Sequence, residues 1–348
     1  MTLKEFARLL GLSPTTVSRA LGGYPEVKEE TRRRVREAAI THDYRPNRRA
    51  ASLATGRAMA IGHVIPTAFG HEMVNPIFSD FIAGAGEIYA RHGYDMVLSV
   101  VSDGDEARAY RQMAMAGNVD GLIVHGPREN DPRIALLKGA GLPFVVHGRA
   151  PVEPTDYSFV DIDNLRAFHR ATDLLLDLGH RRIALLNGIE TMDFARRRRD
   201  GYVGALTARG LAPLPDHMES AEMTEHSGHA AASRMLDAPD APTAFLVSSH
   251  IMALGVRRAI QDRGLTMGRD ISVVIHDDML SYLANGAPPG IGGTEGPVFT
   301  ATRSSVRAAG RRCAEILMAR IGGHPPELVQ EIWECELVLG ASTGPGPV

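Results

Sequence analysis

The stretch Gly11-Leu12-Ser13-Pro14-Thr15-Thr16-Val17-Ser18-Arg19-Ala20-Leu21 decides how the beginning of the chain folds. Gly11 ends a first predicted helix, residues 3–10, whose apolar residues recur at helical spacing behind the N-cap Thr2. Ser13 is a favourable N-cap for a second helix, and Pro14 suits its first position because the N–H that proline lacks has no partner there. Two short helices joined by so tight a turn predict a helix-turn-helix, whose second helix enters the major groove of DNA.

The second predicted helix has a polar side on which five residues are candidates for contact with DNA. Pro14, Thr15 and Arg19 are expected to face base edges, because the first residues of such a helix point into the groove. Thr16 and Ser18 are expected to reach phosphate oxygens, which position the helix without reading the sequence. This part of the chain is therefore expected to bind double-stranded DNA.

Charge is distributed unevenly along the chain. The first 60 residues hold 12 basic and six acidic side chains, whereas the remaining residues hold 26 basic and 35 acidic ones. A third helix predicted over residues 28–41 carries part of the basic charge. A basic head suits DNA phosphates, although a solvated helix face of the same charge is the plain alternative.

The composition indicates a soluble globular protein. The chain of 348 residues is 44% hydrophobic and 23% charged, and on a prior of ~150 residues per domain it is long enough for more than one domain. No apolar run approaches the ~18 residues of a membrane span, and the first residues lack the pattern of a signal peptide. We therefore expect a cytoplasmic protein with no membrane contact. Cys313 and Cys335 show no metal-ligand spacing and are expected to be reduced thiols.

From residue 60 onward, short apolar runs alternate with helical stretches, a pattern that predicts parallel sheets. The runs are 60–66, 95–101, 121–124, 144–147, 183–186, 244–247 and 271–275. They fit either one long doubly wound sheet or two smaller ones, with a ligand bound beyond the carboxyl ends of the strands. The sequence contains none of the motifs GxGxxG, GxxxxGKS/T, GxSxG and HExxH, so no enzyme activity, cofactor or metal is expected.

The helix-turn-helix stretch, together with Leu3-Lys4-Glu5-Phe6-Ala7, Glu30-Thr31-Arg32 and Tyr44-Arg45-Pro46-Asn47, resembles the LacI/GalR family of transcriptional repressors. The resemblance implies a DNA-binding domain over residues 1–43 and a hinge over residues 44–57. In that family the hinge helix pairs with that of a second copy in the minor groove, where an apolar side chain wedges between base steps. The hinge residues expected to contact DNA are Asn47, Arg48, Ala50 and Leu53, with Leu53 as the wedge. An ordinary linker is the alternative.

Residues further along the chain resemble the effector-binding body of the same family, in the same order: 178–186, 198–202, 242–244, 252–255 and 270–274. The resemblance implies a type I periplasmic-binding-protein fold, in which two doubly wound α/β subdomains are joined by three crossings. The first subdomain is expected over 58–160 with 289–320 and the second over 161–288 with 321–340, with crossings near Asp161, Pro288 and Ile321.

The resemblance also implies a ligand cleft with eight candidate contacts, namely Phe78, Asp161, Phe194, Arg198, Met223, Ser249, His250 and Asp277. Arg198 precedes Gly201 in the spacing Arg-x-x-Gly, and its guanidinium suits sugar hydroxyls or a carboxylate, although a run of four arginines can also be a solvated face. Asp277 ends a predicted strand and is expected to accept hydroxyl protons of the ligand, unless it caps a helix instead. His250 and His276 depart from the family pattern, and different ligand contacts, a pH-sensitive cleft and plain core imidazoles all remain open for them.

The sequence thus predicts a homodimeric repressor whose affinity for operator DNA is controlled by a small molecule. Sites that pair arginine with aspartate and aromatic rings usually hold polyols, so a sugar is the expected effector. Residues 299–306, with 276–280 upstream, are also similar to regulators of α-glucoside uptake in α-proteobacteria. One alternative is a purine or another corepressor that strengthens operator binding. The other is a sugar-binding protein without DNA function, which would leave residues 1–56 unexplained.

Overall fold

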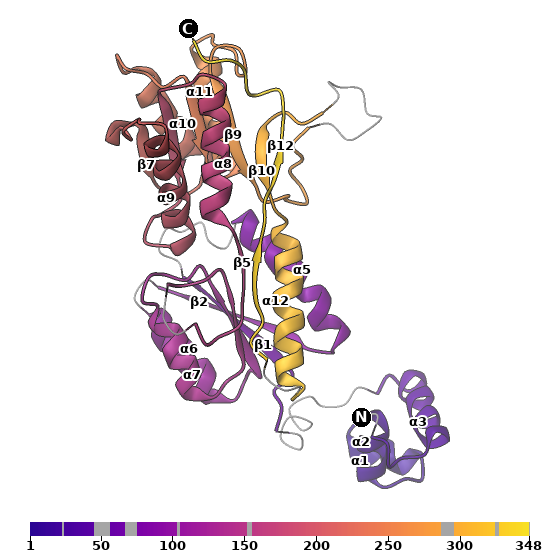
Figure 1. The fold of residues 1–348 in the computed structure, drawn as a ribbon. Coiled ribbons are helices and arrows are strands. Elements are labelled where there is room, and N and C mark those ends of the chain that lie inside the picture. The colour runs from indigo at the N-terminus through magenta and orange to yellow at the C-terminus, as the bar shows by residue number, and fades with distance from the viewer. Residues whose placement is uncertain are drawn as a thin grey trace. The chain divides into compact units, whose positions relative to one another are not determined.

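The computed structural model describes residues 1–22, 24–44, 56–66, 75–102, 105–151, 155–286, 296–323 and 327–347. These residues form two compact units, Met1–Met59 and Ala60–Val348, whose elements are labelled in Figure 1. The hinge contacts expected of Asn47, Arg48, Ala50 and Leu53 fall outside the described residues.

Three helices make up the described part of the first unit, and local capping explains where each begins. They are α1 Leu3–Leu9, α2 Pro14–Leu21 and α3 Glu29–Thr41. Thr2 and Glu5 form a reciprocal capping box at the start of α1. The Ser13 side chain accepts the Thr16 N–H at 3.0 Å and so caps α2. The three predicted helices are therefore confirmed, and α3 starts one residue later than expected because Lys28 is its N-cap.

A small apolar core holds these helices together. Phe6 of α1, Val17 of α2 and Val35 of α3 are fully buried in one cluster. The Phe6 ring also stacks on Tyr44, with the ring centroids 4.1 Å apart. Because Tyr44 follows α3, this contact joins the beginning of the unit to the end of its last helix.

The second unit contains two six-stranded sheets, and the first has the order β11-β5-β4-β3-β1-β2. Its strands are β1 Ala60–Pro66, β2 Asp95–Val101, β3 Gly121–His125, β4 Phe144–His147, β5 Phe159–Ile162 and β11 Gln330–Trp333, all paired in parallel. Its helices are α5 Pro76–Arg91, α6 Glu106–Ala116, α7 Pro132–Ala140 and α12 Val306–Ile321. Helices α6 and α7 bury one side of the sheet, while α12 packs against β3, β4, β5 and helix α5.

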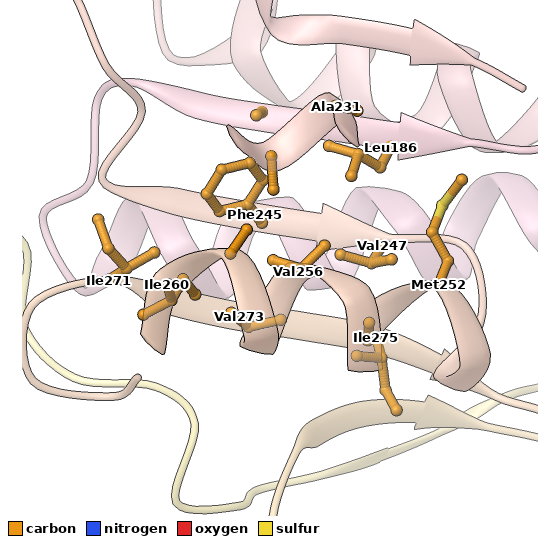
Figure 2. Packing of buried hydrophobic residues seen from close by; sticks show 14 of the residues in the cluster. Leu186, Ala231, Phe245, Val247, Met252, Val256, Ile260, Ile271, Val273 and Ile275 are labelled. Atoms are coloured by element: carbon orange, nitrogen blue, oxygen red, sulfur yellow. The ribbon is translucent and has the colours of Figure 1, made fainter. Parts of the chain in front are cut away.

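The second sheet has the order β12-β10-β9-β8-β6-β7 and is parallel except for the pair β10 and β12. Its strands are β6 Ile183–Asn187, β7 Met218–Ser220, β8 Ala244–Val247, β9 Ser272–Asp277, β10 Thr300–Arg303 and β12 Glu336–Val338. Its helices are α8 Asn164–Asp177, α9 Asp193–Ala208, α10 Glu225–Leu236 and α11 His250–Asp262, with the 3-10 turn η2 Pro215–His217. Figure 2 shows one side of this sheet, where Phe245 and Val273 of the strands meet Val256 and Ile260 of α11.

All seven predicted apolar runs are strands, so the α/β fold with two doubly wound sheets is confirmed. Strands β5, β7, β10, β11 and β12 were not predicted from the sequence. These strands are only three or four residues long, and so short a run carries little periodic signal.

Within the described residues the chain passes between the two sheets three times, and two of these crossings differ from the prediction. After β5 the chain enters α8, which packs on the second sheet, so the first crossing is close to Asp161. Strand β10 belongs to the second sheet and α12 packs on the first, so the second crossing is at residues 304–305 rather than near Pro288. Strands β11 and β12 belong to different sheets, which places the third crossing at residues 334–335 rather than near Ile321. The second and third crossings were misplaced because the short strands β10, β11 and β12 were not predicted from the sequence.

Candidate nucleic-acid interface and ligand cleft

The polar side of α2 faces solvent. Pro14, Thr15, Ser18 and Arg19 are exposed, whereas the apolar side of the helix is buried in its own unit. Thr16 is partly buried, and its hydroxyl lies 2.8 Å from the hydroxyl of the N-cap serine. The structure therefore presents four of the five predicted DNA contacts freely, while the fifth also takes part in capping the helix.

In the second unit, a close approach between α8 and α9 positions Arg198. A Cβ atom on Gly201, one helical turn after Arg198, would lie 2.2 Å from the carbonyl oxygen of Leu165 in α8. A larger residue would force the two helices apart. The spacing Arg-x-x-Gly thus has a packing origin, because the glycine brings Arg198 beside Asn164 at the first turn of α8.

The Arg198 side chain is buried, with 4% of its surface exposed. Its Nε donates to Asn164 Oδ1 at 2.8 Å and its Nη1 donates to the Ser248 carbonyl oxygen at 2.8 Å. The guanidinium carbon lies 5.0 Å from the ring centroid of Phe168 and 4.9 Å from that of Phe194. Burial lowers the pKa of Arg198, and nearby carboxylates oppose that shift. The guanidinium is thus held rigidly between two aromatic rings.

Asp161 supports the position of Arg198 indirectly, through Asn164. Its carboxylate accepts from Arg149 Nε at 2.9 Å and lies 3.4 Å from Asn164 Nδ2. Burial raises the pKa of Asp161 to about 6, and the guanidinium of Arg149 opposes the shift. Asp161 therefore orients Asn164, which in turn holds Arg198.

A second set of hydrogen bonds anchors the Ser248 side of the site. Ser248 Oγ donates to Asn187 Oδ1 at 2.8 Å, and Asn187 Nδ2 donates to the carbonyl oxygen of Ala195 in α9 at 2.8 Å. Sequence reasoning missed Asn164, Asn187 and Ser248. Asn187 follows the predicted run 183–186 and Ser248 follows the run 244–247, so their positions at the carboxyl ends of strands were a usable signal.

The two carboxylates at the end of β9 have different roles. Asp277 Oδ1 accepts the Met279 N–H at 2.9 Å, so this side chain stabilises a turn. Asp278 lies 3.4 Å from His276 Nε2. Burial alone would raise the pKa of Asp278, but the imidazole of His276 and the guanidinium of Arg198 hold it below its ordinary value. Because side chains alternate along a strand, Asp278 shares the side of His276, and it is the carboxylate that sequence reasoning missed.

Phe194 and Met223 both lie next to Gly188. A Cβ atom on Gly188 would lie 3.0 Å from the Phe194 ring and 3.5 Å from Met223 Sδ. Ser249 is the N-cap of α11, because its Oγ accepts the Met252 N–H at 3.1 Å. This hydrogen bond gives Ser249 a structural role whether or not it touches a ligand.

His250 and His276 differ in how well their rings are satisfied. Within the described residues, His250 Nδ1 is buried without a hydrogen-bond partner, and its ring lies edge-on to Phe299 with centroids 5.3 Å apart. His276 Nδ1 lies 3.1 Å from Thr302 Oγ1. Burial lowers the pKa of both imidazoles. The Nδ1 nitrogen of His250 therefore has unused hydrogen-bonding capacity within the described residues, whereas His276 is tied into the sheet.

At the carboxyl ends of the first sheet, three histidines and two phenylalanines form an aromatic wall. His125 and His147 are neighbours on β3 and β4, and Phe78 meets the His125 ring edge-on at 5.0 Å between centroids. Phe81 lies 4.3 Å from the His147 ring. His63 Nδ1 lies 3.0 Å from His125 Nε2 and continues the line into the core. Phe78 was predicted from the sequence as a ligand contact, whereas the three histidines were not. Each histidine nevertheless falls in a predicted strand or directly after one.

In the described part of the chain, no three histidine, cysteine or acidic side chains are grouped so that they could hold a metal ion. None of the described helices is long and apolar enough to cross a membrane. Cys313 and Cys335 are buried free thiols, as predicted.

Known proteins match this chain over its whole length. Residues 2–47 match the bacterial regulatory proteins of the lacI family, and residues 172–343 match a periplasmic binding protein-like domain. The HTH-type transcriptional regulator AglR of Rhizobium meliloti (strain 1021) is 47% identical over 351 residues, which cover 100% of this chain and 95% of that protein. The chain belongs to the LacI family of bacterial transcriptional regulators.

Other relatives and solved structures are also similar to this chain over nearly its whole length. The regulator RafR of Escherichia coli is 33% identical, with 96% of each chain covered. The structure of a complex of the transcriptional regulator CelR with cellobiose is 29% identical with a TM-score of 0.70, covering 98% of this chain and 99% of that chain. The lac repressor dimer bound to operator and the anti-inducer ONPF is 26% identical with a TM-score of 0.80, covering 99% of both chains.

Because Gly201 sets the distance between α8 and α9, replacing it should disturb this LacI-family cleft. We expect Gly201→Ala to lower the free energy of unfolding by ~1–3 kcal/mol through overpacking. Gly204→Ala in the same helix is the matched control, because its nearest neighbour would be 3.7 Å from the new Cβ atom. Urea denaturation checks both variants, and equal stability of the two would show that Gly201 does not set this packing.

The buried histidine wall should make the protein sensitive to acid. Burial lowers the pKa of His63 to about 3 and that of His147 to about 4, from 6.5. Below pH ~6.5 the unfolded chain therefore binds more protons than the folded chain. The free energy of unfolding consequently decreases as the pH falls from ~6.5 toward the lowered pKa values. Between pH ~6.5 and ~5 each such histidine should cost about 1–2 kcal/mol.

Urea denaturation at several pH values measures this dependence. His147→Gln should flatten it, whereas His226→Gln, at an exposed position, should leave it unchanged. An identical pH dependence in all three proteins would contradict the assignment of a neutral His147.

Proposed function

We propose that this protein is a homodimeric repressor whose affinity for operator DNA is controlled by an uncharged sugar. The observation that carries the proposal is the buried guanidinium of Arg198 between the rings of Phe168 and Phe194. Sugar hydroxyls accept hydrogen bonds from a guanidinium and donate to a carboxylate, and their C–H faces pack on aromatic rings. Asp278 supplies a carboxylate whose charge acts on this guanidinium and opposes the lowering of its pKa.

The balance of charge favours an uncharged ligand over a phosphorylated one. Arg198 is accompanied by the carboxylates of Asp278 and Asp161, which act on it electrostatically. A phosphate group would be repelled by these carboxylates and would need more cations than the site offers. A neutral polyol, in contrast, uses donors and acceptors in equal measure.

The relatives support a sugar and narrow its kind. The CelR structure that resembles this chain is described as a complex with cellobiose, which is a neutral disaccharide. The similarity of residues 299–306 and 276–280 to regulators of α-glucoside uptake favours an α-glucoside here. We therefore propose a small α-glucoside as effector and a carbohydrate-utilisation operon as the regulated target.

A dimer is proposed because the lac repressor that resembles this chain is a dimer on its operator. Apolar surface is available for it, because Leu98 and Val100 on the edge strand β2 are 43% and 50% exposed and Tyr282 is 63% exposed. A twofold dimer would read a pseudo-palindromic operator with two copies of α2. Asp278 is added to the effector contacts predicted from the sequence, which remain part of this proposal: Phe78, Asp161, Phe194, Arg198, Met223, Ser249, His250 and Asp277.

A thermal-shift screen tests the proposed effector. Maltose, sucrose and trehalose should raise the melting temperature, because a ligand at ~100 times its dissociation constant adds ~2.7 kcal/mol of stability. Arg198→Lys should abolish the shift, since a lysine cannot reproduce the two directed hydrogen bonds. Arg199→Ala is the matched control. Arg199 is the next residue of the same helix, and its partly exposed side chain pairs with Glu190. A shift by guanine or hypoxanthine alone would replace the sugar with a purine corepressor.

Operator recognition by α2 is tested with duplexes selected by the wild-type protein from random-sequence DNA. Arg19→Ala should weaken binding to the selected duplex by ~1–3 kcal/mol, the cost of a lost bidentate base contact. Binding to unselected DNA should change much less. Arg33→Ala in α3, an exposed arginine near Glu37, provides the control for loss of charge. Equal losses on both kinds of DNA would make Arg19 a phosphate contact.

A further inference from the structure

Asp80 of α5 is a buried carboxylate whose partners come from both sides of the cleft. It is 4% exposed, it accepts the Ser281 N–H at 2.5 Å, and its Oδ1 lies 3.5 Å from Arg307 Nη1. Ser281 follows β9 of the second sheet, whereas Arg307 belongs to α12, which packs on the first. A buried carboxylate is costly unless it is paired, so both partners are needed to keep it there.

The segment that Asp80 holds also carries the cleft carboxylate. Asp278 lies three residues before Ser281, and its carbonyl oxygen accepts the Val306 N–H at 3.1 Å. Asp277 is tied in the same way, because its carbonyl oxygen accepts the Ser304 N–H at 3.1 Å. Residues 277–281 are therefore fastened both to the second crossing and, through Asp80, to α5.

Helix α5 itself carries two aromatic rings that contact histidines of the first sheet. Phe78 contacts the His125 ring and Phe81 contacts the His147 ring, and Asp80 lies between them in sequence. A ligand held by Asp278 on one side and Phe78 on the other would thus touch two segments that Asp80 joins directly.

Helices α5 and α12 lie against each other as a locked pair (Figure 1). A Cβ atom on Gly84 would be 2.1 Å from the Arg307 carbonyl oxygen, and one on Gly310 would be 2.1 Å from the Phe81 carbonyl oxygen. Arg307 also donates to Glu87 Oε1 at 2.7 Å and 3.0 Å. Packing this close leaves little room for sliding, so a shift at Asp80 moves both helices together.

We infer that Asp80 is the positioning residue that couples effector binding in the cleft to the α5–α12 pair, and hence to operator affinity. This inference rests on the proposed function. The partners of Asp80 in the described part of the chain are Ser281 and Arg307, which are not proposed effector contacts, so its loss leaves the effector site standing. Its loss does remove the direct connection between α5, which carries Phe78, and the segment that carries Asp278. Through that connection the two sides of the cleft respond to each other.

The test measures the ratio of operator affinities without and with effector, using full-length protein, a selected duplex, and maltose, sucrose and trehalose. A ratio of about 5- to 150-fold is expected for the wild type, and about threefold or less for Asp80→Ala. Sugar affinity, measured by calorimetry without DNA, should change by less than about threefold, which a general loss of structure would not allow. Asp80→Asn keeps the acceptor for the Ser281 N–H and should lie between the two.

Glu87→Gln is the matched control, because it removes the other carboxylate of Arg307 without touching residues 277–281. It should retain the wild-type ratio. If the Asp80→Ala protein does not fold, Asp80→Asn, which has the same shape, decides the question by a ratio below that of Glu87→Gln. A wild-type ratio in the Asp80 variants would overturn the inference alone, whereas a wild-type protein that ignores all three sugars would overturn the proposed function with it.

Discussion

Burial of a positive charge is the constraint on which the cleft depends. An isolated guanidinium in apolar surroundings would cost far more than a fold of marginal stability tolerates. Arg198 is kept because Asn164 and Ser248 accept its hydrogen bonds, while the charge of Asp278 lies nearby. These partners come from α8, the end of β8 and the end of β9. The guanidinium therefore keeps its position only when all three elements pack in this arrangement. The packing of the second sheet and the chemistry around Arg198 thus depend on the same contacts.

Features encoded by neighbouring residues could be predicted from the sequence. Ser13 and Pro14 indicate the start of α2 because capping is decided within one turn. The run 244–247 indicates β8 because a strand buried on both faces is apolar throughout. Arg198 was found through its spacing to Gly201, and the structure supplies the reason in the close contact with Leu165.

Features decided by distant residues could not be predicted in this way. Strand β12 is only three residues long, and it is recognisable as a strand through its antiparallel pairing with β10. The crossings at 304–305 and 334–335 were misplaced because β10, β11 and β12 were not predicted. Asp278 was not predicted as a site residue, because its proximity to His276 depends on where β9 ends, and a shift of one residue turns a side chain to the other face of the sheet.

The same kind of contact that positions Arg198 also limits how the body can move. Glycines bring α8 against α9, and α5 against α12, so closely that sliding within either pair would force backbone atoms together. The connections between the two sheets include the three crossings and the hydrogen bond from the Ser281 N–H to Asp80, so a change in their relation must act on these contacts. An effector that changes operator affinity is then expected to act on how the two sheets, each with its helices, are placed relative to each other. By linkage, an effector that weakens operator binding must itself bind less tightly to the operator complex.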